Sequence, residues 1–286
     1  MNYSSRKLFS FYATIVTITF LGVKMPIVCP LFSGSEGNSI YIENNGVSFL
    51  VDIGRSCKQI EKSIIQNGFN PEKIEYILVT HEHVDHVRGL RTFAKKYNSK
   101  IYASEGTIKE LEKKQILDEK IRYECINLSG TKIGETEINP FEISHDCAQG
   151  YGYSILFDDS KVKISVCSDL GIISDNILNS ISDSNLVVIE SNHDIEMLKK
   201  GPYPFFLKKR ILSDIGHLSN ESCAKLLPKL ASNGTRRFVL YHLSSNNNTP
   251  EIAYESSDSS LKSSGMYNCE LYVAPKANLG ELRVEI

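Results

Sequence analysis

Three of the seven histidines of this 286-residue chain lie in one short segment, HEHVDH, which begins at His81. The segment directly follows residues 76–80 (YILVT), an apolar, β-branched run that indicates a β-strand. Because alternate residues of an extended chain lie on one side, His81 and His83 can converge on one metal ion, while Asp85 and His86 can hold a second ion nearby. Imidazole and carboxylate donors favour zinc, manganese or iron over magnesium or calcium. The alternative is a solvated polar loop that is rich in histidine.

Three further strand-like segments end on a potential metal donor. These donors are His145, Asp169 and His242, and each directly follows an apolar or β-branched run. A single histidine or aspartate at a strand end is usually a turn former or a hydrogen-bonding residue. Two metal ions in ordinary coordination need about seven protein donors, with positions left for water. Together with the first cluster, these three residues supply that set.

The elements expected to position these donors alternate between short apolar strands and charged helices. Strands are expected at residues 39–43, 47–52, 76–80, 142–144, 153–157, 163–168, 186–190, 238–241 and 269–274. Helices are expected at residues 56–68, 88–97, 105–120 and 220–231, and from Thr249 and Pro250 towards Gly265. No internal repeat or break in composition divides residues 25–286, so the sequence predicts one α/β domain there.

Composition and charge exclude several classes of protein. Hydrophobic residues make up 41% and charged residues 23%, which is typical of a globular chain and excludes a disordered or fibrous one. The net charge of -2 means that binding of nucleic acid must come from a local basic patch. The seven cysteines are scattered without a C-x-x-C pair, which argues against a zinc ribbon or a disulfide framework and favours the cytoplasm.

Residues 1–24 differ from the rest of the chain. A basic start at Arg6 precedes an apolar run from Leu8 to Val23, as in a signal peptide, but no small-x-small cleavage site follows. The run is shorter than the roughly 20 residues of a bilayer span. The free thiols and the strand expected soon after Met25 instead favour a dispensable extension, or translation that starts at Met25. Export through this segment is the less favoured alternative, and no membrane partner is expected.

The order of the donors resembles the metallo-β-lactamase-fold superfamily, whose members carry HxHxDH, a later His, an Asp and a final His. The resemblance spans most of the chain and implies a four-layer αβ/βα sandwich, in which helices flank two mixed β-sheets. It also implies two divalent transition-metal ions, with zinc or manganese preferred and iron as the alternative. The implied ligands are His81, His83 and His145 for the first ion, Asp85, His86 and His242 for the second, and Asp169 as a bridge between them.

More specific motifs resemble the YycJ/WalJ branch of this superfamily. They are LFSGSEGNS from Leu31, ESNHD from Glu190, GHLSN from Gly216 and HLS from His242. Members of this branch are DNA exonucleases, so the resemblance implies hydrolysis of phosphodiester bonds by a hydroxide held between the metals, with Asp85 helping to orient it. One departure follows His145, where the expected proline before Gly-Tyr is absent, and this affects substrate fit more than metal binding.

Four residues outside the implied ligand set are expected to support the site. Asp52, Glu190 and His193 are expected to hydrogen-bond to ligands or to brace their loops. His217 precedes Ser219, a good N-cap, and would lie beside a helix N-terminus that suits a phosphate. A similar element lies beside the scissile phosphate in the related tRNA-processing branch, so His217 could protonate the leaving oxygen or bind that phosphate. The alternative is a buried histidine that caps a loop carbonyl.

Residues 199–210 (KKGPYPFFLKKR) interleave basic and aromatic side chains. Basic groups neutralise phosphates and aromatic rings stack on bases, so Lys208, Lys209 and Arg210 are expected to bind nucleic acid. The alternative is an exposed loop with an apolar anchor.

Three functions stay open. A metal-dependent DNA exonuclease is favoured by the GHLSN element and the basic segment. The same donors would also suit a hydrolase of a small ester, thioester or lactam, or a metal-stabilised binding module without catalysis. A di-iron oxidoreductase is disfavoured, because His83 stands where such relatives carry a carboxylate. The sequence does not distinguish DNA from RNA or indicate an oligomeric state.

Overall fold

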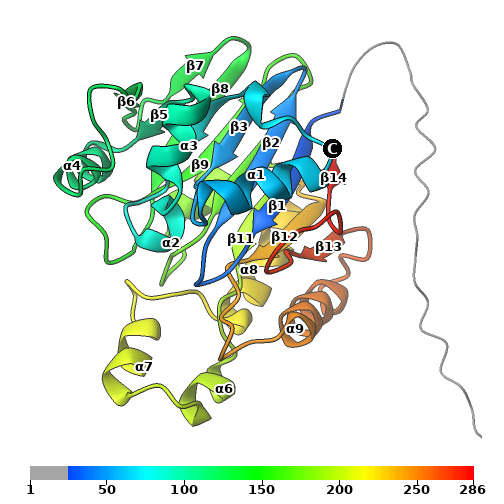
Figure 1. Cartoon of the computed structure of the whole chain (residues 1–286). Helices are drawn as coiled ribbons and strands as arrows, with labels where there is room; N and C mark the ends of the chain where they lie inside the picture. The colour runs from blue at the N-terminus through cyan, green and yellow to red at the C-terminus, as the bar shows by residue number, and fades with distance from the viewer. Residues whose placement is uncertain (1–24) are drawn as a thin grey trace, which may run out of the picture.

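Two seven-stranded mixed β-sheets face one another, and helices cover the outer face of each (Figure 1). This computed structural model describes residues 25–286, and the extension predicted at residues 1–24 lies outside the described residues. The four layers confirm the predicted fold class. Within residues 25–286, no helix is long and apolar enough to cross a membrane.

The first sheet has the strand order β14-β1-β2-β3-β4-β5-β6. Its strands β1, β2 and β3 are antiparallel neighbours, whereas β3, β4, β5 and β6 run parallel. The bounds are β1 (Ile27–Phe32), β2 (Ser39–Asn44), β3 (Val47–Val51), β4 (Ile74–Leu78), β5 (Lys100–Ala103), β6 (Tyr123–Cys125) and β14 (Val284–Glu285).

The second sheet has the order β13-β12-β11-β10-β9-β8-β7. Its strands β7 to β10 are antiparallel neighbours, whereas β10, β11, β12 and β13 run parallel. The bounds are β7 (Thr131–Ile133), β8 (Thr136–Glu142), β9 (Tyr151–Phe157), β10 (Val162–Cys167), β11 (Leu186–Glu190), β12 (Arg237–Tyr241) and β13 (Glu270–Val273).

Hydrophobic side chains fill the space between the sheets and the space beneath the helices on each side. Along β11, Val188 lies in the central core, whereas Val187 and Ile189 pack under the outer helices, as the two-residue period of a strand requires. The helices are α1 (Cys57–Gln66), α2 (Val84–Val87), α3 (Leu90–Tyr97), α4 (Glu105–Lys113), α5 (Asp175–Ile181), α6 (Ile195–Lys200), α7 (Phe205–Ile211), α8 (Asn220–Ser232) and α9 (Pro250–Ser263). Helices α1, α3 and α4 cover the first sheet, and α5, α8 and α9 cover the second.

Two predicted helix starts agree with the structure because their caps form. The side chain of Ser219 accepts a hydrogen bond from the backbone N–H of Ser222 at the start of α8. The side chain of Thr249 accepts one from Ile252 at the start of α9, where Pro250 occupies the first turn. These caps fix the loops that enter both helices.

Three predicted bounds are wrong. The helix expected at residues 88–97 begins only at Leu90, after the separate short helix α2. The helix expected at residues 105–120 ends at Lys113, because Gln115 adopts a left-handed φ of 54°. The strand expected at residues 142–144 ends at Glu142, and the backbone N–H of Ile143 instead donates to Gly150, which closes a loop.

Candidate metal centre

The expected donors meet at one edge of the sandwich because the strands before them end there. Strands β3 and β4 are parallel neighbours in the first sheet, as are β10, β11 and β12 in the second. In α/β folds, ligands bind outside the carboxyl ends of such strands. His81 follows β4, Asp169 follows β10 and His242 follows β12. The strand directions therefore deliver all three residues to one place.

Three residues at this edge have an uncommon backbone conformation. Asp52, Asp169 and His242 have φ angles of 62°, 56° and 58°, a left-handed conformation that non-glycine residues rarely adopt. Such conformations cost of the order of 1–3 kcal/mol each and concentrate at functional sites. Each residue stands within two positions of the end of a strand, so the chain turns sharply at the point where its side chain reaches the site.

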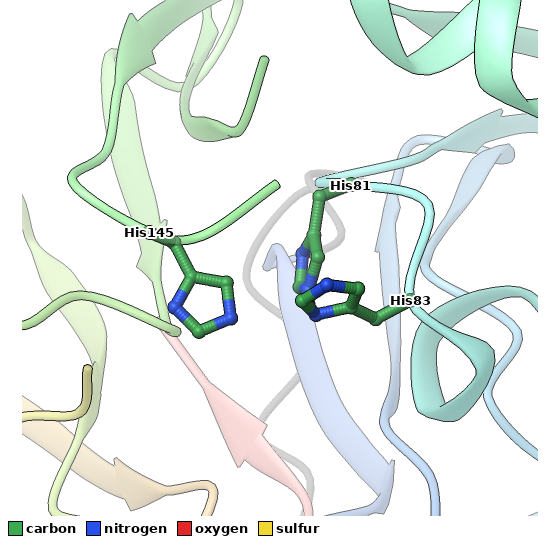
Figure 2. Close-up of side chains that lie close together, drawn as sticks. All are labelled: His81, His83 and His145. Carbon is green, nitrogen blue, oxygen red and sulfur yellow. The ribbon is translucent and has the colours of Figure 1, made fainter. Parts of the chain in front are cut away.

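The first donor set contains three histidines from two loops. His81 and His83 come from the loop after β4, and His145 approaches from the opposite side (Figure 2). One nitrogen from each ring lies within 4.8 Å of the other two, and Nε2 of His81 is 3.0 Å from Nδ1 of His83. Nδ1 of His145 donates to the carbonyl oxygen of Gly216 (3.1 Å), which leaves its Nε2 free to act as a ligand.

The second donor set contains Asp85, His86 and His242, whose ligand atoms also lie within 4.8 Å of one another. Asp85 Oδ2 is 3.6 Å from Nε2 of His86 and 3.6 Å from Nε2 of His242. Asp169 stands between the two sets. Its Oδ2 is 3.3 Å from His86 Nε2, and its Oδ1 is 3.6 Å from His242 Nε2 and 3.9 Å from His145 Nε2. One carboxylate therefore reaches both donor sets.

Asp52 stabilises the part of the site that comes from the first sheet. Its carboxylate accepts hydrogen bonds from Nδ1 of His86 (2.7 Å) and from both the N–H and the hydroxyl of Thr80 (2.8 Å each). The first bond leaves Nε2 of His86 free to face Asp85 and Asp169. Asp52 thus fixes the ring of a potential ligand and the loop that carries His81.

Glu190 has the corresponding place in the second sheet. Its Oε1 accepts hydrogen bonds from Nδ1 of His217 (2.8 Å) and Nδ1 of His242 (2.9 Å), and its Oε2 accepts the N–H groups of Leu170 and Leu218. Burial alone would raise the pKa of Glu190, but the charges and hydrogen bonds of the two histidines lower it to about 2. The buried side chain is therefore a carboxylate that orients both rings.

The donors fit divalent cations. Asp52, Asp85, Asp169 and Glu190 place four carboxyl groups in one small region. The buried atoms Asp169 Oδ2 and His242 Nε2 have no hydrogen-bond partner among residues 25–286. Buried polar atoms without partners are costly and rare, and buried charges are usually paired or bound to metal. Two divalent ions at the two donor sets would satisfy both requirements.

The donors open into a pocket of about 250 Å³. His83, Asp85, His145, Asp169, His217 and His242 line it, together with Ser35, Asn192, Tyr203, Leu207, Arg210, Ile211 and Ser244. Arg210 enters this pocket and makes two hydrogen bonds to Asp146, at 2.5 and 2.8 Å. Lys208 and Lys209 line a different hollow. The three residues expected to bind nucleic acid therefore fall into two separate places.

The side chain of His193 makes no hydrogen bond to the donors, whereas its backbone carbonyl oxygen accepts the N–H of Asn220 (2.9 Å) and so links two loops. It is buried, and neither of its ring nitrogens has a hydrogen-bond partner within the described part of the chain. The preceding residue, Asn192, instead lines the pocket and donates from Nδ2 to the carbonyl oxygen of His242 (2.9 Å). Nothing in the charge pattern distinguishes Asn192 in the sequence.

Two other residues, Asn38 and Glu82, make contacts at the site that were not foreseen. The backbone N–H of Asn38, in the glycine-rich loop after β1, donates to the carbonyl oxygen of Asp85 (2.8 Å), and its side-chain Nδ2 lies 3.2 Å from His86 Nε2. The side chain of Glu82, within the HEHVDH segment, accepts a hydrogen bond from the N–H of Ala148 (2.8 Å). It thereby joins the HEHVDH segment to the loop that carries His145.

Comparisons with known proteins agree with this geometry. Residues 49–243 match the family described as "Beta-lactamase superfamily domain". The exodeoxyribonuclease WalJ of Streptococcus pneumoniae strain D39 is 37% identical over 227 residues, which cover 78% of this chain and 84% of WalJ. The exodeoxyribonuclease YycJ of Bacillus anthracis is 37% identical over 238 residues, which cover 82% and 89%.

A solved structure shows the same architecture. The metallo-β-lactamase-fold protein YhfI from Bacillus subtilis superposes with a TM-score of 0.68 at 14% identity, covering 92% of this chain and 100% of YhfI. At that identity the likeness concerns the fold alone. The family match over residues 49–243 and the two relatives at 37% identity show the relationship itself. The chain belongs to the metallo-β-lactamase-fold superfamily and is a WalJ- and YycJ-like member of it.

Proposed function

We propose that this protein is a metal-dependent phosphodiesterase that degrades DNA from an end. The observation that carries the proposal is that the carboxylate of Asp169 lies within 3.9 Å of His145 in one donor set and of His86 and His242 in the other, in a pocket that also holds His217 and Arg210. The two relatives named exodeoxyribonucleases, each of which matches more than three quarters of the chain, support the choice of DNA.

The residues divide into two metal sites. His81, His83 and His145 would hold one divalent transition-metal ion, and Asp85, His86 and His242 would hold the other, with Asp169 shared between them. Zinc or manganese suits this mixture of imidazole and carboxylate, and iron is the alternative. Such a pair of ions lowers the pKa of water and stabilises the attacking and leaving oxygens of a phosphoryl displacement.

His217 would donate a proton to the leaving oxygen. Because its Nδ1 donates to Glu190, its Nε2 is the ring atom left to transfer a proton within the pocket. Asp85 lies beside both His86 and His242 and would help to orient the attacking water. No serine or cysteine nucleophile is required in this scheme.

Arg210 would bind a phosphate of the substrate. Its guanidinium group makes a two-point contact with Asp146 at the pocket wall, and a guanidinium group binds phosphates with the same geometry. Asp146 also lies 3.4 Å from Nε2 of His145, so Arg210 is held close to the first donor set.

The proposal is tested by digesting three DNA substrates with the metal-loaded protein. They are a linear duplex labelled at its 5′ end, the same duplex labelled at its 3′ end, and a covalently closed circle. We expect progressive shortening of the linear DNA, with the order of label release reporting polarity, and survival of the circle. An Asp169→Asn protein is the matched control and should be inactive. Cleavage of the circle, or hydrolysis of thioester or lactam substrates without any action on DNA, would contradict the proposal.

A further inference from the structure

Helix α7 presents two different faces. Leu207, Arg210 and Ile211 line the metal pocket. Residues offset from these around the same helix line a separate hollow of about 570 Å³, which is formed by Phe205, Lys208, Lys209, Leu212 and Ser213 with Lys199 of α6. The spacing of Phe205, Lys208, Lys209 and Leu212 is that of one helical stripe. Figure 1 shows α6 and α7 extending beyond the two sheets.

The hollow combines an apolar wall with free positive charge. Phe205 is 81% exposed and Leu212 beside it is 47% exposed, and grouped exposed apolar side chains often mark a binding site. Lys208 and Lys209 have no ion-pair partner in the described part of the chain, whereas Lys199 is paired with Glu196 at 3.1 Å. Lys208 donates to the carbonyl oxygen of Lys199 (2.7 Å), which holds its ammonium group at the rim.

We propose that this hollow binds an unpaired nucleobase of the DNA strand that continues from the metal pocket. The inference rests on the proposed function and specifies its substrate, a DNA end with a single-stranded overhang. The ring of Phe205 would stack on the base, and Lys208 and Lys209 would neutralise the adjoining phosphates. A base within a duplex has no free face to offer, so a paired end would not engage Phe205.

Distance and charge support this occupant. The two faces of α7 are separated by about one helix diameter, roughly 10 Å, which a strand crosses in about three stacked nucleotides. Arg210 carries positive charge on the pocket side of the same helix, and Lys208 and Lys209 carry it at the hollow. In a chain with a net charge of -2, this local group of basic side chains is complementary to a nucleic-acid backbone.

The test compares Phe205→Ala with Phe206→Ala. Phe206 is also exposed, at 74%, but does not line the hollow, so it is a matched control for lost aromatic surface. Binding is measured with the metal-loaded protein and phosphorothioate-linked duplexes that resist hydrolysis, either blunt or with a short overhang. We expect Phe205→Ala to weaken binding of the overhang by roughly 5- to 150-fold, the effect of losing one stacked base. Phe206→Ala should leave it within about twofold of the unmodified protein.

An abasic nucleotide identifies the contact. Placed in turn at each overhang position, it should weaken binding to the unmodified protein at one position and leave binding to Phe205→Ala unchanged there. In addition, changing Lys208 and Lys209 together to Gln should reduce the dependence of log affinity on log salt by about 1.4, or 0.7 for each phosphate contact in a single strand.

Failure of the inference is distinguishable from failure of the proposed function. Hydrolysis of a bis-nitrophenyl phosphodiester reports the metal site alone and should be the same in Phe205→Ala as in the unmodified protein. Degradation of DNA with equal affinity for blunt and overhanging ends, and no effect of Phe205→Ala, would overturn the inference and leave the nuclease intact. A protein that neither binds nor hydrolyses DNA would overturn both. Loss of a protein partner in Phe205→Ala with unchanged affinity for DNA would also overturn the inference.

Discussion

Nδ1 of His217 lies 2.8 Å from Oε1 of Glu190, a carboxylate with no exposed surface. Two backbone N–H groups hold the other oxygen of Glu190, so the carboxylate is fixed and in turn fixes the imidazole. The side chain of His217 is 18% exposed and lines the metal pocket. Its hydrogen bond goes to a buried acid that also orients His242, which places it in the same network as the donors.

Replacing His217 with Ala should slow DNA hydrolysis without removing metal. A positioned general acid contributes roughly 10²- to 10⁴-fold, so turnover on DNA should fall by that factor. A nitrophenyl phosphodiester has a good leaving group that needs little protonation, and its turnover should fall much less. The two rates are compared at matched metal content. Equal losses on both substrates, together with a lower melting temperature, would show that His217 is only structural.

Replacing Arg210 with Ala should raise KM for DNA. Hydrogen bonds to a charged group contribute about 1.5–3 kcal/mol, so a rise of roughly 10- to 150-fold is expected. Arg210→Lys should restore only part of this, because an ammonium group cannot make the two-point contact. Steady-state kinetics on labelled duplex DNA measure the effect, and a KM that is unchanged in Arg210→Ala would exclude a phosphate contact.

His193 should make the protein sensitive to acid. Burial lowers the pKa of His193 from 6.5 to about 4, so between these values the unfolded chain takes up a proton that the folded protein does not. The free energy of unfolding should therefore fall as the pH drops from 6.5 towards 4, by about 1.4 kcal/mol per pH unit from this group. Urea unfolding of metal-free protein measures it. His193→Leu should lose less stability over this range, and an identical loss would contradict the assignment.

A protein that begins at Met25 should match the full chain in melting temperature, metal content and hydrolysis of DNA. Every expected ligand lies between His81 and His242, far along the chain from residues 1–24. Side-by-side purification of the two forms is the test. Removal of residues 1–24 during secretion from the cell would instead support the export alternative.

Local pattern predicted the alternation of strands and helices and the donors at strand ends, whereas the four-layer sandwich was implied by the resemblance to the superfamily. His81, Asp169 and His242 each come within three residues of the end of an apolar strand, and strand direction together with the facing of the two sheets brings them together. Contacts between distant segments carry no such pattern. Arg210 and Asp146 are 64 positions apart, and their pairing separates Arg210 from the neighbouring lysines. Asn192 was missed because its role depends on the position of His242 rather than on its own charge.

The central claim is that two metal ions, both bound by Asp169, catalyse DNA hydrolysis. Measuring metal content together with the rate of DNA hydrolysis tests this claim most directly. Elemental analysis of the purified protein should give about two transition-metal ions per chain, with nucleotide release from a linear duplex rising as the second site fills. His81→Ala and Asp169→Asn should each lower metal content and abolish hydrolysis. Native-like metal content in both variants, or full hydrolysis of DNA by protein freed of metal with a chelator, would contradict the two-metal site.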